Sequence, residues 1–119
     1  MSLYKKNLGK IGEQTACNYL QNNGFKIIKR NFQTRFGEID IIAEKNNTLY
    51  FIEVKTRSNL DKGAPYEAVN KYKIIHVKKA ANYFNVLNYK YKNYKMKIGV
   101  FSIITNNNEN IINFYDDLI

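Results

Sequence analysis

The stretch GEIDIIAEKNNTLYFIEVKTR, residues 37–57, decides how this chain is expected to fold. It contains two runs of mostly apolar residues, 38–43 and 48–56, separated by an Asn-Asn pair that is typical of a hairpin turn. Three charged residues, Asp40, Glu53 and Lys55, interrupt these runs. Strands packed between helices are normally apolar on both faces, and burying an unpaired charge is costly. We therefore predict that the three charges pair with one another or bind a ligand.

The remaining sequence predicts helices before and after this hairpin. Apolar residues recur at helical spacing over 8–23, and Gly24 is placed to end that helix. The other expected elements are a strand at 25–31, a turn at 34–37, a loop at 58–65, a helix at 66–87, a basic tyrosine-rich connection at 89–97, a strand at 98–105, a turn at 106–108 and a last strand at 111–115. This order predicts an α/β fold with a central mixed sheet flanked by helices, an αβββαβ core, in one domain covering residues 1–119.

The alternation of side chains along a strand predicts where the charges meet. Glu53 and Lys55 are two residues apart, so they share one face of their strand, while Val54 points to the other face. Hairpin pairing can bring Asp40 beside Glu53 on the shared face. Two carboxylates and an ammonium group would then converge near the strand ends.

Such a cluster suits the hydrolysis of a phosphodiester. Carboxylates at close range repel, and both ionise readily only when a cation lies between them. Oxygen ligands of this kind favour Mg²⁺ or Mn²⁺, which lower the pKa of a bound water. Lys55 is expected to neutralise the phosphate or to position the attacking water. The alternative for Asp40, Glu53 and Lys55 is a structural ion-pair network inside the sheet.

Glu13 is a further candidate for this cluster. On a helical wheel it lies at the margin of the apolar stripe, from which a carboxylate can point at the edge of the sheet. The competing interpretation is an ordinary first-turn glutamate favoured by the helix dipole. For His76 we expect a surface or packing role, and for Cys17 a packed thiol.

Positive charge dominates the composition, with 19 Lys+Arg against 10 Asp+Glu and a formal net charge of +9. In so small a domain this predicts a polyanionic partner such as DNA, although solubility alone is the competing explanation. Candidate phosphate contacts are Arg57 at the end of a strand, and Lys71, Lys73, Lys78 and Lys79 on the predicted polar side of the second helix.

Several classes of protein are excluded by the same composition. The single cysteine excludes an internal disulfide framework and a multi-cysteine zinc site. No run approaches the roughly 20 apolar residues of a membrane span, and residues 1–10 do not resemble a secretory signal. We expect a cytoplasmic protein without membrane contact.

Five motifs together carry a family resemblance. They are Gly9-X-X-Gly12-Glu13, residues 37–43, residues 51–57, Glu67-Ala68-Val69, and a lysine-rich helix containing Lys73, Ala80 and Ala81. This set resembles the YraN-type family of predicted endonucleases. That bacterial group is related to Holliday-junction resolvases within the PD-(D/E)XK nuclease superfamily.

The resemblance implies a restriction-endonuclease-like fold with active-site positions at Glu13, Asp40, Glu53 and Lys55. It implies that Mg²⁺ or Mn²⁺ is held by Asp40, Glu53 and the Val54 carbonyl, with Glu13 helping directly or through water. It further implies DNA, branched or otherwise structured, as the substrate. Because resolvases cut two strands symmetrically, it also implies a homodimer.

Two other hypotheses stay open. One is a catalytically inactive nucleic-acid-binding module on the same fold, and the other is a structural or partner-recruiting protein.

The last third of the chain resembles the YraN-type family less well. Members of that family often carry an acidic residue near the start of the fourth strand, where this chain has Gly99.

Overall fold

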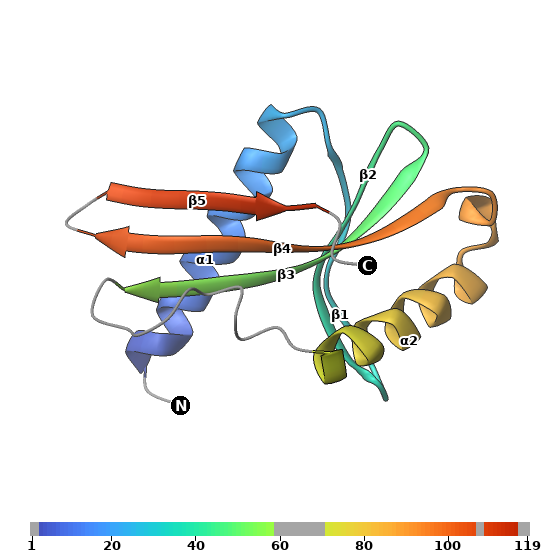
Figure 1. Cartoon of the computed structure of the whole chain (residues 1–119), viewed down its shortest axis with the longest axis horizontal. Helices are drawn as coiled ribbons and strands as arrows, with labels where there is room; N and C mark the ends of the chain where they lie inside the picture. The colour runs from blue at the N-terminus through green and yellow to red at the C-terminus, as the bar shows by residue number, and fades with distance from the viewer. Residues whose placement is uncertain (1–2, 59–70, 107–108, 117–119) are drawn as a thin grey trace.

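The computed structural model describes residues 3–58, 71–106 and 109–116. The elements along the chain are α1 (Leu3–Asn22), β1 (Lys26–Thr34), β2 (Gly37–Lys45), β3 (Thr48–Ser58), α2 (Lys71–Leu87), the 3-10 turn η2 (Tyr89–Tyr91), β4 (Lys95–Asn106) and β5 (Glu109–Tyr115) (Figure 1). The predicted α/β class with a central mixed sheet is confirmed. Within the described ranges, no helix has both the length and the apolar character that crossing a membrane requires.

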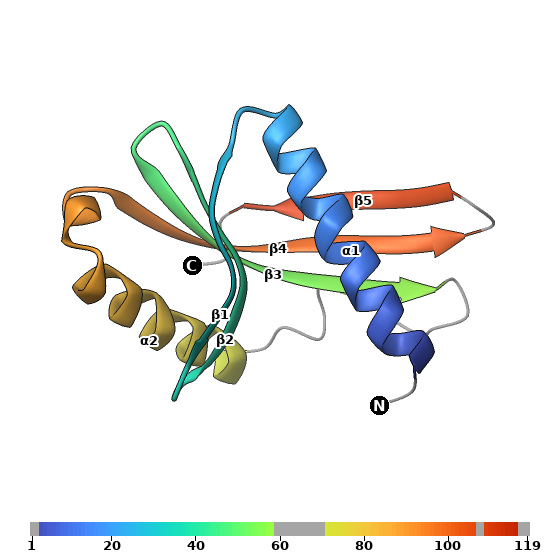
Figure 2. The same ribbon diagram turned by 180° about the vertical axis from the view of Figure 1, so that it is seen from behind.

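The five strands form one sheet in the order β1-β2-β3-β4-β5. The β1–β2, β2–β3 and β4–β5 pairs are antiparallel, and only β3–β4 is parallel. A parallel pair needs a long crossover connection, and α2 lies in that connection. The sheet is strongly twisted, so that β1 and β2 stand steeply to the other three strands (Figures 1 and 2).

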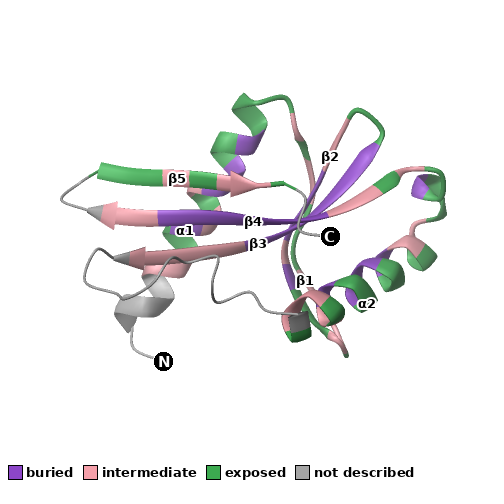
Figure 3. Cartoon of the chain, in the orientation of Figure 1, coloured by how far each residue is buried: buried purple, intermediate pink, exposed green. Residues whose placement is uncertain are grey.

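The two helices cover opposite faces of the sheet (Figures 1 and 2). Ile41 and Ile52 belong to the core cluster that includes Leu20 of α1. Their neighbours Ile42 and Phe51 belong to the cluster under α2. Burial is greatest along the central strands and on the sheet-facing side of each helix (Figure 3). The hairpin is therefore apolar on both faces, as expected for a strand pair between two helices.

The turn between β2 and β3 has the predicted chemistry. Asn46 and Asn47 both adopt positive φ, 52° and 58°, which two-residue type I′ hairpin turns require. The ladder then runs from Lys45↔Thr48 to Ile41↔Ile52. This turn sets the register that places Asp40 and Glu53 next in line.

Several element ends differ from the sequence expectation. α1 begins at Leu3 rather than at residue 8, and β1 continues to Thr34 rather than ending at 31. The 89–97 connection was predicted wrongly in part, because it contains η2 and its last three residues begin β4. Parallel pairing with β3 starts at Thr48↔Lys95 and accounts for this early start. The parts of the predicted loop, second helix and last turn at 59–65, 66–70 and 107–108 lie outside the described residues.

Gly99 lies in β4 where the end of β5 crosses it. A Cβ at this position would be 2.8 Å from the carbonyl oxygen of Tyr115 and 3.2 Å from Cε1 of Phe114. The first of these contacts is with backbone, so a change of rotamer cannot relieve it. The lack of a side chain at Gly99 therefore lets β5 pack closely against β4.

We predict that Gly99→Ala lowers the free energy of unfolding by about 1–3 kcal/mol, because the overpacked methyl group must displace β5. Urea unfolding followed by circular dichroism measures this change. Gly9→Ala is the matched control, because a Cβ there meets no atom within 4 Å and alanine favours the helix. Equal stability of Gly99→Ala and the wild type would contradict the close packing.

Candidate functional site

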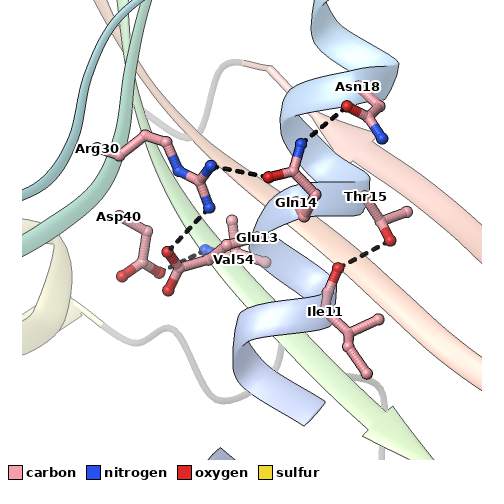
Figure 4. Close-up of polar contacts among 8 residues, drawn as sticks. All are labelled: Ile11, Glu13, Gln14, Thr15, Asn18, Arg30, Asp40 and Val54. Carbon is pink, nitrogen blue, oxygen red and sulfur yellow. Dashed lines mark hydrogen bonds and ion pairs between the residues drawn. The ribbon is translucent and has the colours of Figure 1, made fainter. Parts of the chain in front are cut away.

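The candidate site lies where β2 and β3 stop pairing. Ile41↔Ile52 is the last pair of their ladder, and Asp40 and Glu53 are the next residues of the two strands. Asp40 Oδ2 accepts a hydrogen bond of 2.8 Å from the backbone N–H of Val54 (Figure 4). The Asp40 carboxylate thus takes the place of the backbone carbonyl that would accept this hydrogen bond if the ladder continued. The two acidic residues therefore lie at the point where β2 and β3 separate.

Glu53 is buried between two lysines. Its side chain is 8% exposed, and Oε1 lies 3.5 Å from Lys55 Nζ and 3.4 Å from Lys73 Nζ. Its other oxygen, Oε2, is buried and has no hydrogen-bond partner in the described part of the chain. The predicted meeting of Asp40, Glu53 and Lys55 is therefore found, and one buried oxygen of Glu53 has no hydrogen-bond partner among the described residues.

The surroundings of Asp40 disfavour its negative charge. Burial is the largest cause, and the charge of Glu53 is the second; together they raise the pKa of Asp40 to about 7. The hydrogen bond from Val54 opposes this shift because it favours the ionised form, whereas the charges of Glu13 and Glu38 add to it. At neutral pH without a cation, this site resists holding all of its carboxylates ionised.

Glu13 approaches the same point from α1. Its carboxylate points toward Asp40 (Figure 4), and Arg30 holds it with Nη2 at 3.9 Å from Glu13 Oε1. Arg30 Nη1 also donates to Gln14 Oε1 at 3.0 Å. Because α1 begins at Leu3, Glu13 lies in the middle of the helix. The interpretation of Glu13 as a first-turn residue stabilised by the helix dipole is therefore wrong.

Gly12 allows the close approach of α1 to β3. A Cβ at this position would collide with Thr56 Oγ1 and lie 3.2 Å from Thr56 Cβ. The Gly-Glu pair of the N-terminal motif thus combines a close helix–sheet contact with an acidic side chain directed at the site.

The predicted basic residues differ in their exposure to solvent. Lys78 and Lys79 are exposed on α2, as expected for its polar side, and Arg57 is half-buried near the end of β3. The side chain of Lys71 lies outside the described residues. Lys73 was assigned to the polar side, and this was wrong, because it contacts Glu53.

The sequence contained a signal for the position of Lys73. Lys73 is spaced along α2 so that it lies on the same side of the helix as Val77, Ala80 and Phe84. These three residues of α2 are all buried. This spacing places the lysine on the sheet-facing stripe. Arg30 had no comparable signal, because its contact with Glu13 depends on how α1 crosses β1.

The acidic pair fits a divalent cation. Among the described residues, no group of three or more His, Cys, Asp or Glu side chains is arranged to hold a metal. Mg²⁺, however, is commonly bound through one or two carboxylates together with waters and substrate phosphate. A cation would give a partner to the buried Oε2 of Glu53 and would relieve the crowding of negative charge at Asp40. The carbonyl of Val54 faces the same gap as its N–H, because both groups of a strand residue point to one neighbour.

Fold and site together define a small basic α/β domain with a partly buried cluster of acidic and basic side chains where two central strands separate. The chain belongs to UPF0102, an uncharacterised protein family, whose family model matches residues 12–105. The matched range includes Glu13 on α1 and both strands of the acidic pair.

Similar proteins span almost the whole chain. A UPF0102 protein of Caldicellulosiruptor bescii is 40% identical over 106 residues, 89% of either chain. One of Dictyoglomus thermophilum is 42% identical over 110 residues, 92% of either chain. One of Clostridium novyi is 40% identical over 116 residues, 96% of either chain.

The raised pKa of Asp40 predicts how stability depends on pH in the metal-free protein. Below about pH 4, Asp40 is protonated in both the folded and the unfolded state. Between that pH and about 7 the unfolded chain releases the proton while the folded protein retains it, so folding stability falls as pH rises. At about 1.4 kcal/mol per pKa unit, the loss amounts to a few kcal/mol.

Urea unfolding in EDTA at pH 5 and pH 8 tests this prediction. Asp40→Asn keeps an acceptor for Val54 but has no charge, so it should lose less stability than the wild type between the two pH values. Asp116→Asn, a change at an exposed carboxylate, should behave like the wild type. The same pH dependence in Asp40→Asn as in the wild type would show that Asp40 is not the buried titrating group.

Proposed function

We propose that the protein is a metal-dependent endonuclease that hydrolyses phosphodiester bonds in DNA. The observation that carries this proposal is the convergence of Asp40 and Glu53, with the ammonium group of Lys55 beside them. One oxygen of Glu53 has no hydrogen-bond partner among the residues that the structure describes. An acidic residue in one strand followed by Glu-X-Lys in the next resembles the PD-(D/E)XK superfamily, and the helix, hairpin and crossover order supports a restriction-endonuclease-like fold.

Mg²⁺ or Mn²⁺ would be held by Asp40, Glu53 and the carbonyl of Val54, with Glu13 contributing directly or through water. When bound, the cation supplies positive charge to the phosphate and acidifies a water for attack on phosphorus. Both metals prefer oxygen ligands of this kind.

The protein's own residues then have separate tasks. Lys55 is 30% exposed, so its ammonium group can reach a phosphate oxygen while it remains near Glu53. Lys73, with Nζ 3.4 Å from the same carboxylate oxygen, orients the Glu53 side chain. Arg30 restrains Glu13 on the α1 side, so that its carboxylate stays directed at Asp40.

The positive surface of α2 would position DNA without reading its sequence. The residues that we assign to phosphate contacts are Lys78, Lys79 and Arg57, together with Lys71 and with Lys73 at the edge of the site. The net charge of +9 supports a polyanionic partner. A homodimer would present two sites to branched or structured DNA, and we place this reaction in the cytoplasm.

One observation favours the second candidate, a nucleic-acid-binding module without cleavage activity. Oε1 of Glu53 already has two ammonium partners, so the carboxylate is partly neutralised without a metal. Titration with Mn²⁺ separates the two functions, because only the nuclease requires Mn²⁺ binding that depends on both Asp40 and Glu53.

We predict that the purified protein cuts at least one of linear, flapped and four-way DNA in Mg²⁺ or Mn²⁺, and that EDTA abolishes cleavage. Glu53→Gln should lower the rate by about 100-fold or more, because it removes negative charge from the metal site. Gel electrophoresis of end-labelled DNA measures both rates.

Glu109→Gln is the matched control, because Glu109 is an exposed carboxylate on β5 and its change should leave cleavage unaltered. Equal cleavage by the wild type and Glu53→Gln would identify a contaminating nuclease. DNA binding without cleavage on any substrate, and without any effect of Mn²⁺, would establish the binding module instead.

A further inference from the structure

Two hollows lie side by side between α2 and the tip of the β1–β2 hairpin. One has a volume of about 290 Å³ and is lined among others by Phe36, Glu38, Tyr72, Lys73 and His76. The other has a volume of about 630 Å³ and is lined by Gln33, Thr34, Arg35, Phe36 and Tyr83. The two hollows adjoin at Phe36, which lines both, and together we call them the α2 groove.

The α2 groove begins at the acidic site. Lys73 lines its smaller hollow, and the same ammonium group lies 3.4 Å from Glu53 Oε1. Glu38 lines that hollow too, and its charge contributes to the raised pKa of Asp40. A strand whose phosphate lies at the acidic pair can therefore continue directly into the groove.

Aromatic rings are available along the α2 groove. Tyr72 is 71% exposed and Tyr83 is 44% exposed. Such large rings at the surface can stack on bases, and each stack is worth about 1–3 kcal/mol. In a continuous duplex the base faces are already stacked on one another, so only unpaired bases can use these rings.

Cations accompany the rings. The Arg35 guanidinium lies 4.9 Å from the centre of the Phe36 ring, and Lys79 Nζ lies 6.0 Å from it. Both positive groups are exposed and can contact phosphates that follow a stacked base. Aromatic faces combined with a positive groove are typical of single-strand binding.

The smaller hollow also offers groups for the edge of a base. His76 lines this hollow, and the centre of its ring lies 4.3 Å from the centre of the Tyr72 ring. The Glu38 carboxylate on the opposite wall is an acceptor for a base N–H and disfavours a phosphate at that spot. This arrangement suits a base inside the hollow with its phosphates at the basic rim.

We propose that the α2 groove binds an unpaired stretch of a nucleic acid strand beside Glu53. The substrate then carries unpaired nucleotides next to the phosphodiester that is cut, as in a flap, a bulge or a single strand. This inference rests on the proposed function for the position of the cut, whereas strand binding itself can be measured without cleavage.

Binding of DNA oligonucleotides containing 2-aminopurine to the full chain in EDTA tests the inference. The wild type should quench the fluorescence of single-stranded DNA and bind it more tightly than a blunt duplex of the same sequence. Tyr72→Leu should weaken single-strand binding by about 10-fold, which corresponds to about 1.4 kcal/mol of lost stacking. A thermal melt of each variant verifies that it is folded.

Tyr89→Leu is the matched control. Tyr89 is 70% exposed and has a lysine, Lys92, 4.4 Å from its ring centre, but it lies on η2 and not among the residues that line the groove. Its change should leave affinity within about 2-fold of the wild type, well inside a difference of 1 kcal/mol.

Equal effects of Tyr72→Leu and Tyr89→Leu, or equal binding of duplex and single strand without quenching, would overturn the inference. Cleavage of DNA with no such stacking would overturn the α2 groove and leave the proposed nuclease intact. Stacking without cleavage would support the groove and overturn the nuclease.

Discussion

The site depends on one hydrogen bond, which Asp40 Oδ2 accepts from the N–H of Val54 at the point where β2 and β3 separate. The backbone ladder between β2 and β3 ends at Ile41↔Ile52, before it reaches Val54. The Asp40 carboxylate therefore accepts from a backbone N–H that would otherwise lack its partner. This arrangement draws Asp40 into the gap and places it beside Glu53. The rest of the fold supports the gap, since α1 brings Glu13 from one side and α2 brings Lys73 from the other.

Holding two carboxylates in this position creates an electrostatic conflict. The protein neutralises Glu53 Oε1 with Lys55 and Lys73, leaves Oε2 without a partner among the described residues, and raises the pKa of Asp40. A structural ion pair would satisfy its carboxylates more completely, because buried charges are normally paired and hydrogen-bonded. Incomplete pairing of this kind is what the proposed cation site requires, whereas a network that only stabilises the sheet would leave no carboxylate oxygen without a partner.

Much of the fold and part of the site could be predicted from the sequence. The Asn-Asn turn set the hairpin register, and side-chain alternation then placed Glu53 and Lys55 on one face with Asp40 near them. These are local rules, which explains their success. The charge of Lys73 predicts a solvent-facing position, whereas its helical spacing from Val77 and Phe84 predicts the sheet-facing side on which it contacts Glu53. Neither Arg30 nor the hollows around Phe36 could be predicted, since they depend on how a helix crosses the sheet and how α2 packs against a hairpin tip.

The most direct test of the account is a crystal grown with Mn²⁺ and measured by anomalous diffraction at the manganese edge. We expect one anomalous peak at the site, between the carboxylates of Asp40 and Glu53, because both would hold the cation. The peak should vanish in crystals of Asp40→Asn. Well-ordered crystals in saturating Mn²⁺ with no peak between the two carboxylates would contradict the central claim that they share a metal ion.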